Sequence, residues 1–535
     1  MKLDYKKTFY IGLAFFIITI FWQTYDSIIT KILIDKFGLN QTWSGVVMAL
    51  DNVLALFMLP LFGALSDKSN RKRGRRTPYI IVGTVVAAFA FMGLSYMDNI
   101  QTARIQDTSI IQKYEVIQDA EVDRLDLVYW NLIITDMADE RQEALIDGTI
   151  TQAKYDQWEE KVLTPISDRI DESTSGQLKV SDLAYIDGLY TVYLSSLAWE
   201  ITVLNPLNFI VFIVVLLIAL IFMSIFRSPA VSLMPDVTMK PLRSKANAVI
   251  NLMGAAAGVS SLVILTLFGL GGKSYVGYSS AFIAVGAIML IVLVIFLWRV
   301  KEPKMVEERV ADDKLWGFTE NEEEESAQDA HALSREKKIS LYLILFSVFL
   351  WFMGYNAVMT KVSYYAPSVL QLSSFTLPLL IANVTAIIAF IPIGILSTRF
   401  GRRKTILFGI VLLALCFGSV FFLSKDTEWI MYIVFGLTGI GWATINVNSY
   451  PMVVELAKGS NVGRYTGYYY SFSMAAQIIT PIFSGFLMDT LHPTVLFPYA
   501  TVFVSLAFIT MFFTKHGDSK AEKKTILESF DVDMD

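Results

Sequence analysis

The stretch Gly63-Ala64-Leu65-Ser66-Asp67-Lys68 recurs later in the chain as Gly394-Ile395-Leu396-Ser397-Thr398-Arg399, and this repeat decides how the fold is organised. Each copy ends a long apolar run and is followed by a Gly-Arg-Arg cluster, which begins at Gly74 and at Gly401. A repeat that includes both an apolar run and the loop after it indicates two halves with the same build.

A second motif repeats at the same spacing to within one residue. Four residues of the first apolar run recur in the seventh: Tyr25, Asp26, Thr30 and Lys31 become Tyr355, Asn356, Thr360 and Lys361. Two matches at one spacing predict two homologous halves in parallel orientation. This architecture is found in transporters that rock one half against the other around a site near mid-membrane.

The composition predicts a polytopic membrane protein. Of the 535 residues, 54% are hydrophobic and 17% are charged, whereas soluble domains have roughly 25% charged residues. The apolar residues form runs of about 20, which is the length that crosses the hydrocarbon core. We therefore predict an all-α fold with twelve transmembrane helices in two pseudo-symmetric six-helix halves, at residues 9–34, 44–66, 77–97, 206–226, 246–269, 279–298, 339–361, 376–397, 404–423, 429–451, 465–488 and 494–514.

The charges predict the orientation. An even number of spans places both termini on one side, and most Lys and Arg residues lie in the loops of that side, so we expect both termini to be cytoplasmic. The run 9–34 is too long for a signal-peptide core and has no cleavage site after it, so it is expected to be a retained helix. We expect a multi-pass protein of the cell membrane in contact with the lipid bilayer.

Two long segments separate the spans. Residues 98–204 carry 21 acidic and 8 basic residues, and they are predicted to form a mostly helical extracytoplasmic insert between helices 3 and 4, dispensable for substrate affinity. Residues 299–338 are predicted to be a cytoplasmic linker. The expected domain order is 1–97 (helices 1–3), 98–204 (insert), 205–298 (helices 4–6), 299–338 (linker), 339–514 (helices 7–12) and 515–535 (cytoplasmic tail).

The sequence argues against several kinds of chemistry. The single cysteine, Cys416, excludes an intramolecular disulfide and a cysteine-based metal site. His331, His492 and His516 are far apart in the sequence, and no phosphate-binding glycine loop is present. We expect no enzymatic activity, no cofactor, no metal site and no nucleic-acid partner.

The loop after the second span resembles the signature of the major facilitator superfamily, Gly-x-x-x-Asp-Arg/Lys-x-Gly-Arg-Arg. Here it begins at Gly63, contains Asp67 and ends in Gly74-Arg75-Arg76-Thr77-Pro78-Tyr79-Ile80. This extended ending resembles the glycoside-pentoside-hexuronide cation symporters and the sucrose/proton symporters. A second similar stretch runs from Gly439 to Gln477 and includes Trp442, Asn446 and Glu455.

The chain departs from this pattern at the cation site. Melibiose-type members have two acidic residues in the second helix, and the corresponding positions here are Leu59 and Ala55. The nearest acid is Asp51, which lies one turn further out. The resemblance therefore implies coupling to protons, with sodium as the alternative.

Four charged residues within the spans need a partner or a function, because a charge inside the bilayer is costly. They are Asp26, Lys31, Asp51 and Lys361. Asp26 and Asp51 lie at one level, about 10–12 Å from the outer ends of their spans, and burial favours the neutral form of a carboxyl group. Both are candidate proton carriers. Alternatively, Asp26 pairs with Lys31 or Lys361, or these lysines extend to the surface.

The charged loop residues form a candidate cytoplasmic gate. They can make charge-assisted contacts to helix ends that hold this side closed, or simply anchor the loops on the cytoplasmic side. The candidates are Gly63, Asp67, Arg75, Arg76, Arg399, Arg402 and Arg403.

A sugar site needs amides for the hydroxyl groups and aromatic faces for the ring. Buried amides are costly without a hydrogen-bond partner, so those within spans are the better candidates. The substrate-binding candidates are Trp22, Gln23, Tyr25, Tyr355, Asn356, Asn383, Trp442, Asn446, Asn448 and Gln477.

These observations predict a monomeric, bacterial, proton-coupled symporter that imports a glycoside or disaccharide by alternating access. A cation-coupled exporter of amphipathic compounds is the alternative within this fold, and an apolar cavity without converging amides would favour it. A membrane sensor that binds a ligand through the insert is the alternative outside it.

Overall fold

The computed structural model describes residues 3–69, 71–106, 125–171, 173, 177–178, 180–239, 242–272, 275–316, 335–370, 372, 374–423, 427–456 and 462–516. Within them, twelve helices are long and apolar enough to cross a membrane, which confirms the predicted number of spans. Residues 317–334 of the predicted linker, which include His331, and most of the tail lie outside the described residues.

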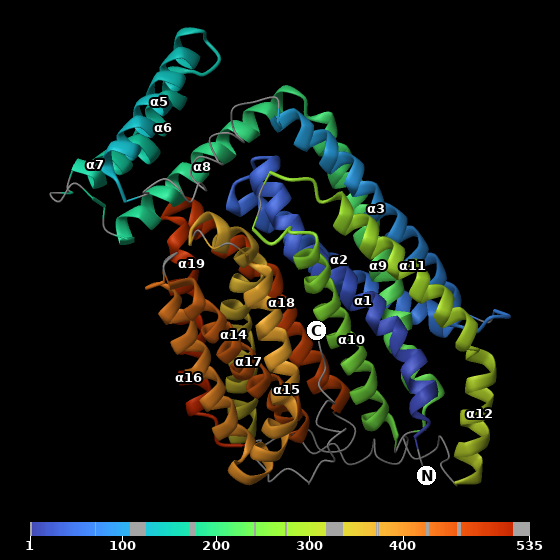
Figure 1. Ribbon diagram of the computed structural model, residues 1–535. Coiled ribbons are helices and arrows are strands. Elements are labelled where there is room, and N and C mark those ends of the chain that lie inside the picture. The colour runs from blue at the N-terminus through green and yellow to red at the C-terminus, as the bar shows by residue number, and fades with distance from the viewer. Residues whose placement is uncertain are drawn as a thin grey trace.

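The helices form two bundles that stand side by side (Figure 1). The first half consists of α1 (Tyr5–Lys31) with its π-helical extension η1 (Ile32–Lys36), α2 (Gln41–Asp67), α3 (Thr77–Gln106), α9 (Leu207–Val237), α10 (Arg243–Leu267) and α11 (Ser279–Arg299). The second half consists of α14 (Arg335–Ser368), α15 (Thr376–Phe400), α16 (Arg402–Val420), α17 (Glu428–Leu456), α18 (Val462–Thr490) and α19 (Leu496–Phe512).

Each half has a hydrophobic core of its own. In the first half, the Phe91 ring lies 4.8 Å from Phe21 and 4.9 Å from Phe282, between centroids. In the second half, the Phe497 ring lies 5.0 Å from that of Tyr365. Because most buried apolar residues contact others of the same half, each half can move as a unit.

The Gly-Arg-Arg clusters start a new helix in each half. Gly74 and Gly401 have φ angles of +104° and +88°, which residues with a Cβ rarely adopt. Gly401 both ends α15 and caps α16. Glycine is therefore required at equivalent turns of both copies.

Several helices extend beyond the predicted spans. α3 continues to Gln106 and α9 to Val237, whereas the predicted spans end at residues 97 and 226. Hydropathy detects the part of a helix that suits hydrocarbon, and backbone hydrogen bonds continue into polar sequence.

The described part of the insert is helical, as predicted. It contains α5 (Leu127–Ile146), α6 (Gln152–Trp158), η2 (Glu159–Leu163), α7 (Thr164–Asp171) and α8 (Val180–Leu204). Gln101 and Ile105 of α3 are buried and contact this region. The segment 98–204 thus includes the last turns of α3, and its dispensability for substrate affinity stays a prediction.

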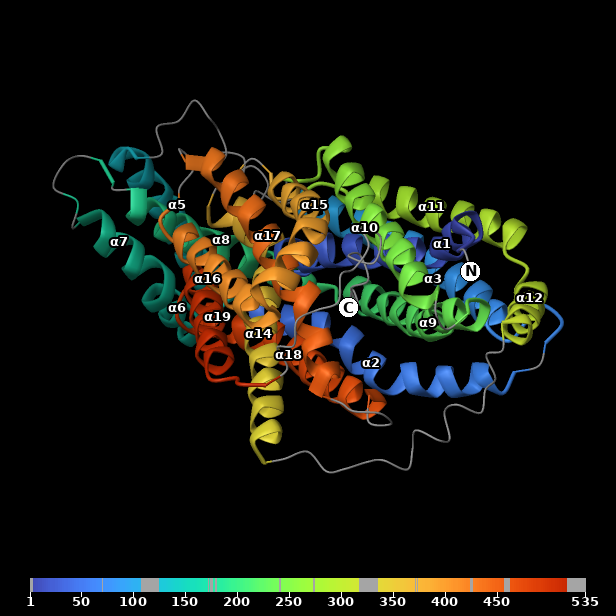
Figure 2. The ribbon, with the colours of Figure 1, turned by 90° about the horizontal axis from the view of Figure 1, so that it is seen from below.

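The bundle has two distinct ends. The insert end carries α8, and the opposite end, which we call the gate-loop end, carries Arg75, Arg76 and α12 (Glu302–Leu315) (Figure 1). Figure 2 shows the two halves from the gate-loop end. Lys7 near the chain start forms an ion pair of 2.9 Å with Glu308 of α12, so the start of α1 also lies at this end.

Candidate substrate and coupling site

The charged loop of the first half forms a partly buried network at the gate-loop end. Arg76 pairs with Asp67, and its Nε lies 2.8 Å from Oδ2 of Asp236. Arg75 forms a 2.7 Å ion pair with the same Asp236. Burial lowers the pKa of the Arg76 guanidinium, but the contacts with Asp236 and Asp67 outweigh this effect, so the pKa is raised. Asp236 was not among the predicted residues, because it lies beyond the predicted fourth span.

The carboxylate of Glu302, at the start of α12, caps α3. It accepts hydrogen bonds from the backbone N–H groups of Arg75, Arg76 and Thr77, at 2.7 to 3.1 Å. Its side chain is buried, and a Cβ at Gly74 would lie 2.3 Å from it. The helix N-terminus favours a negative charge here.

We expect Glu302→Ala to lower the free energy of unfolding by about 1–3 kcal/mol, because it leaves buried N–H groups without an acceptor. The matched control is Glu308→Ala on the same helix, whose side chain is 49% exposed and whose ion pair contributes at most about 1 kcal/mol. Thermal unfolding in detergent measures both. Equal shifts for the two variants would contradict the capping role.

The second copy of the loop is held in a similar way. Arg402 pairs with Glu455, and Arg403 donates to the carbonyl of Phe512. Arg399 lies over the Phe400 ring, 5.7 Å from its centroid. Each of these contacts lies within one half, as does the close approach of Gly63 to Ser228. In this conformation, these contacts brace each half, and a role of the residues in closing the gate-loop end stays a prediction.

The two halves meet instead at the insert end, along a contact that we call the α2–α18 seam. The Asp489 carboxylate of α18 accepts hydrogen bonds from the backbone N–H groups of Gln41 (2.9 Å) and Thr42 (2.7 Å) at the start of α2. Lys361 of α14 donates to the carbonyl of Gln41 at 2.8 Å. The second half thus binds both the backbone N–H and the backbone carbonyl of Gln41, in the first turn of α2.

The expected ion pairs of Asp26 are not formed in the described part of the chain. Lys361 belongs to the seam, and Lys31 donates to the carbonyl of Gly272 at 3.1 Å. Both ammonium groups are fully buried and therefore do not extend to the surface either. Each of the two lysines binds a backbone carbonyl and not the acid of α1, and only the Lys361 contact joins the two halves.

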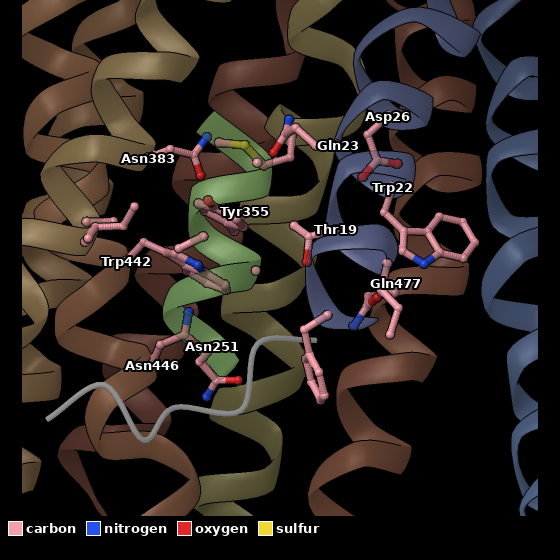
Figure 3. Close-up of a pocket in the computed structure, with 18 of the residues that line it drawn as sticks. Thr19, Trp22, Gln23, Asp26, Asn251, Tyr355, Asn383, Trp442, Asn446 and Gln477 are labelled. Carbon is pink, nitrogen blue, oxygen red and sulfur yellow. The ribbon is translucent and has the colours of Figure 1, made fainter. Parts of the chain in front are cut away.

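A cavity of about 740 Å³ lies between the halves. Asp26 and Asp51 line its deeper part, and Pro235 and Arg243 line it near the gate-loop end. Because the insert end is closed by the seam, the cavity extends toward the gate-loop end. In Figure 3, Trp22 and Asp26 lie on one side of this space, and Asn383, Trp442 and Asn446 lie on the opposite side.

Most of the predicted substrate-binding residues and both acids line this one cavity: Trp22, Gln23, Asp26, Asp51, Tyr355, Asn356, Asn383, Trp442, Asn446 and Gln477. Tyr25 and Asn448 do not. The Tyr25 hydroxyl is buried 3.5 Å from the carbonyl of Val47, and the Asn448 amide donates to the carbonyl of Thr444 at 2.9 Å. Asn446 and Asn448 are two positions apart on one helix and so face different directions.

Aromatic rings form a flat wall of the cavity. Tyr355 and Trp442 are stacked with centroids 3.6 Å apart and planes 2° apart, and Phe352 packs edge-on against Trp442 at 5.3 Å. Such a surface suits the C–H face of a ring, whereas the amides around it suit hydroxyl groups.

Two residues that line this cavity each have a buried donor without a partner among the described residues. The donors are Nε1 of Trp22 and Nδ2 of Asn356, one from each half. Buried donors without a partner are costly and are typically satisfied by a ligand or water.

The two acids share the cavity with residues that sequence analysis missed. Asp26 lies within electrostatic range of Asp51, which accepts a 2.8 Å hydrogen bond from the Asn52 amide. Arg227 of α9 also lies within electrostatic range of Asp51. It follows the predicted fourth span by one residue, so a longer span would have included it among the charged residues. Asn247 and Asn251 of α10 also line the cavity.

The chain is similar to known membrane transporters in sequence. Residues 188–390 and 373–531 match the model of the Major Facilitator Superfamily, and residues 10–105 match the model described as MFS/sugar transport protein. Over 79 residues, the chain is 29% identical to the sucrose transport protein SUC4 of Arabidopsis thaliana. That match spans 15% of the length of this relative.

Solved structures share the fold. The inward open conformation of the xylose transporter XylE from E. coli superposes with a TM-score of 0.56 at 13% identity, covering 98% of each chain. A bacterial homologue of the iron transporter ferroportin gives a TM-score of 0.58 at 12% identity, covering 96% of this chain and 99% of that one. The superfamily model covers more than half of the sequence, and the twelve helices form the expected two halves. The chain therefore belongs to the Major Facilitator Superfamily and is a membrane transporter, not an enzyme.

Proposed function

We propose that this transporter is a proton-coupled symporter that imports a glycoside or disaccharide by alternating access. The observation that carries this proposal is the lining of the cavity, where amides from both halves surround a stacked Tyr355–Trp442 pair. Amides match sugar hydroxyls. An exporter of amphipathic compounds would favour a wholly apolar wall, and this cavity does not have one. The match to the sugar transport model and the similarity to a sucrose transport protein support the same substrate class.

The presence of Asp26 and Asp51 supports coupling to protons. Carboxyl groups in a cavity shared with the substrate can take up a proton on one side of the membrane and release it on the other. The positive-inside distribution supports a cytoplasmic gate-loop end, so the conformation described here corresponds to the inward-facing state of this cycle.

The proposal is tested with purified protein in proteoliposomes. Labelled disaccharides are offered under an imposed proton gradient, with and without an uncoupler. We expect accumulation that the uncoupler abolishes. Accumulation that requires sodium and ignores the uncoupler would contradict proton coupling, and the absence of binding for every glycoside tried would contradict the substrate class.

The amides give a residue-level prediction. We expect Asn446→Ala and Gln477→Ala to weaken sugar binding by about 1–3 kcal/mol each, because the sugar hydroxyls lose their partners. Asn448→Ala is the control on the same helix as Asn446, since its amide points away from the cavity. Isothermal titration measures the affinities. Unchanged affinity in both cavity variants would place the sugar elsewhere.

A further inference from the structure

Helix α8 of the insert crosses the insert end and contacts both halves (Figure 1). Its C-terminal part lies against the first half and its N-terminal part against the second. The superfamily model matches this helix only from residue 188 onward, and no residue of the helix lines the transport cavity. Its two sets of contacts differ in kind.

The contacts with the first half form a tight anchor. At Gly38, which has a φ angle of +72°, a Cβ would lie 2.1 Å from the backbone N of Trp199 and 2.4 Å from the carbonyl oxygen of Ser195. Gln101 of α3 donates to the Thr202 hydroxyl at 3.1 Å. α8 also ends at Leu204, close before the start of α9 at Leu207. Close backbone packing and this short connection tie α8 to the first half.

The hydrophobic core of the insert strengthens this anchor. Beside residues of α5 to α8, the core contains two side chains of the first half, Ile105 and Tyr275. None of the buried residues in this cluster comes from the second half, among the residues that the structure describes.

The contacts with the second half are few and separable, and we call them the latch. The Tyr185 ring stacks on His492 with centroids 4.2 Å apart and planes 15° apart, and a Cβ at Gly188 would lie 3.2 Å from Cε1 of His492. The Thr191 hydroxyl donates to the carbonyl of Asp187 in its own helix at 2.9 Å, and its contact with the carbonyl of Ser368 in the second half is 3.4 Å long. This distance is at the long end of the hydrogen-bond range.

Burial in the latch keeps His492 neutral. Burial, aided by the positive charge of Arg169, lowers the pKa of His492 to about 4, although a hydrogen bond with the backbone of Tyr185 opposes this shift. The Arg169 guanidinium lies over the other ring of the stack, 4.8 Å from the centroid of Tyr185, and pairs with Asp182 at 2.8 Å. The latch is therefore a neutral stack at neutral pH.

We propose that α8 is a strap that latches the insert end in its closed state. When the halves separate at this end, α8 stays with the first half, because the anchor is the stronger contact, and the stack of Tyr185 on His492 breaks. The strength of the latch then sets the share of molecules that are closed at the insert end. This role does not depend on which substrate is carried.

The first experiment measures opening of the insert end directly. Cys416 is replaced by Ser, and Ser44→Cys is introduced as a reporter, since Ser44 is fully buried beside Gly45 in the α2–α18 seam and does not line the cavity. The rate of maleimide labelling is then measured in lipid nanodiscs without substrate. We expect Tyr185→Ala and His492→Ala to raise the rate about two- to tenfold, the range set by the loss of an aromatic pair.

The matched control is Tyr155→Ala, which removes a ring of the insert that packs on Trp158 and not on the second half. We expect no change in labelling for this variant. Equal rates for the latch variants and the unmodified latch would overturn the proposal. Because no substrate is added, this failure is distinct from a failure of the proposed sugar transport.

The second experiment fixes the latch shut. Gly188→Cys and His492→Cys are combined in the Cys416→Ser background and joined by oxidation. We expect uptake to be lost on oxidation and restored by reduction, with each single cysteine variant unaffected by oxidation. Normal uptake by the cross-linked protein would show that α8 need not leave the second half, and would overturn the proposal.

Discussion

Asp51→Asn is expected to abolish uphill accumulation of the substrate while downhill exchange and binding persist. Asparagine resembles the neutral form of the carboxyl group but cannot release a proton, so the variant would move substrate only down its gradient. The side chain lines the cavity and accepts a hydrogen bond from Asn52, and an amide can retain that contact. We also expect the affinity to become insensitive to external pH.

Asp26→Asn is the matched comparison, because Asp26 lines the same cavity from α1 and has no ion pair with either lysine in the described part of the chain. Accumulation ratios in proteoliposomes, under proton and sodium gradients, separate the two acids. If Asp51→Asn still concentrates substrate with proton dependence and Asp26→Asn does not, Asp26 is the carrier.

The second large effect is expected at the α2–α18 seam. A Cβ at Gly45 would lie 2.0 Å from the carbonyl oxygen of Pro481, and a Cβ at Gly485 would lie 2.2 Å from that of Gln41. Both obstacles are backbone atoms of the other half, so no side-chain rotation relieves the clash. Gly45→Ala and Gly485→Ala should destabilise the closed insert end by about 1–3 kcal/mol, or roughly 5- to 150-fold in the conformational equilibrium.

Transport requires one state that is closed at the insert end and one that is closed at the gate-loop end. We therefore expect Gly45→Ala and Gly485→Ala to lose most of their uptake. Hydrogen–deuterium exchange at residues 41–45 should rise, because the first turn of α2 would lose the acceptors and donors of Asp489 and Lys361. Gly467→Ala on α18 is the control, since a Cβ there meets nothing within 4 Å. Normal uptake and unchanged exchange in both seam variants would show that close approach of these helices is not needed.

The family and the number of membrane spans follow from the sequence alone. Hydrocarbon thickness sets the length of each apolar run, so twelve spans can be counted without a structure. The repeated motifs around Gly63 and Gly394 reveal two similar halves because both copies need the same helix ends. The high free-energy cost of buried charges and amides also identifies several of the polar residues that line the cavity, including Asp26, Asp51 and Asn446.

The sequence was less informative about the direction in which a side chain points and the residues that it contacts. Tyr25 and Asn448 have suitable chemistry, but the rotation of their helices turns them into the protein. Arg227 was missed because hydropathy cannot show that α9 continues beyond the membrane core.

What the sequence by itself determined is therefore the number of spans, their pairing into halves and the kinds of side chain at the site. What only the tertiary structure decided is which groups meet across the halves: Lys361 and Asp489 with the start of α2, and α8 with His492. The physical reason is one of range. Hydropathy and helix periodicity are local properties of the chain, whereas these contacts join residues hundreds of positions apart and depend on how two separately folded bodies are placed in one conformation.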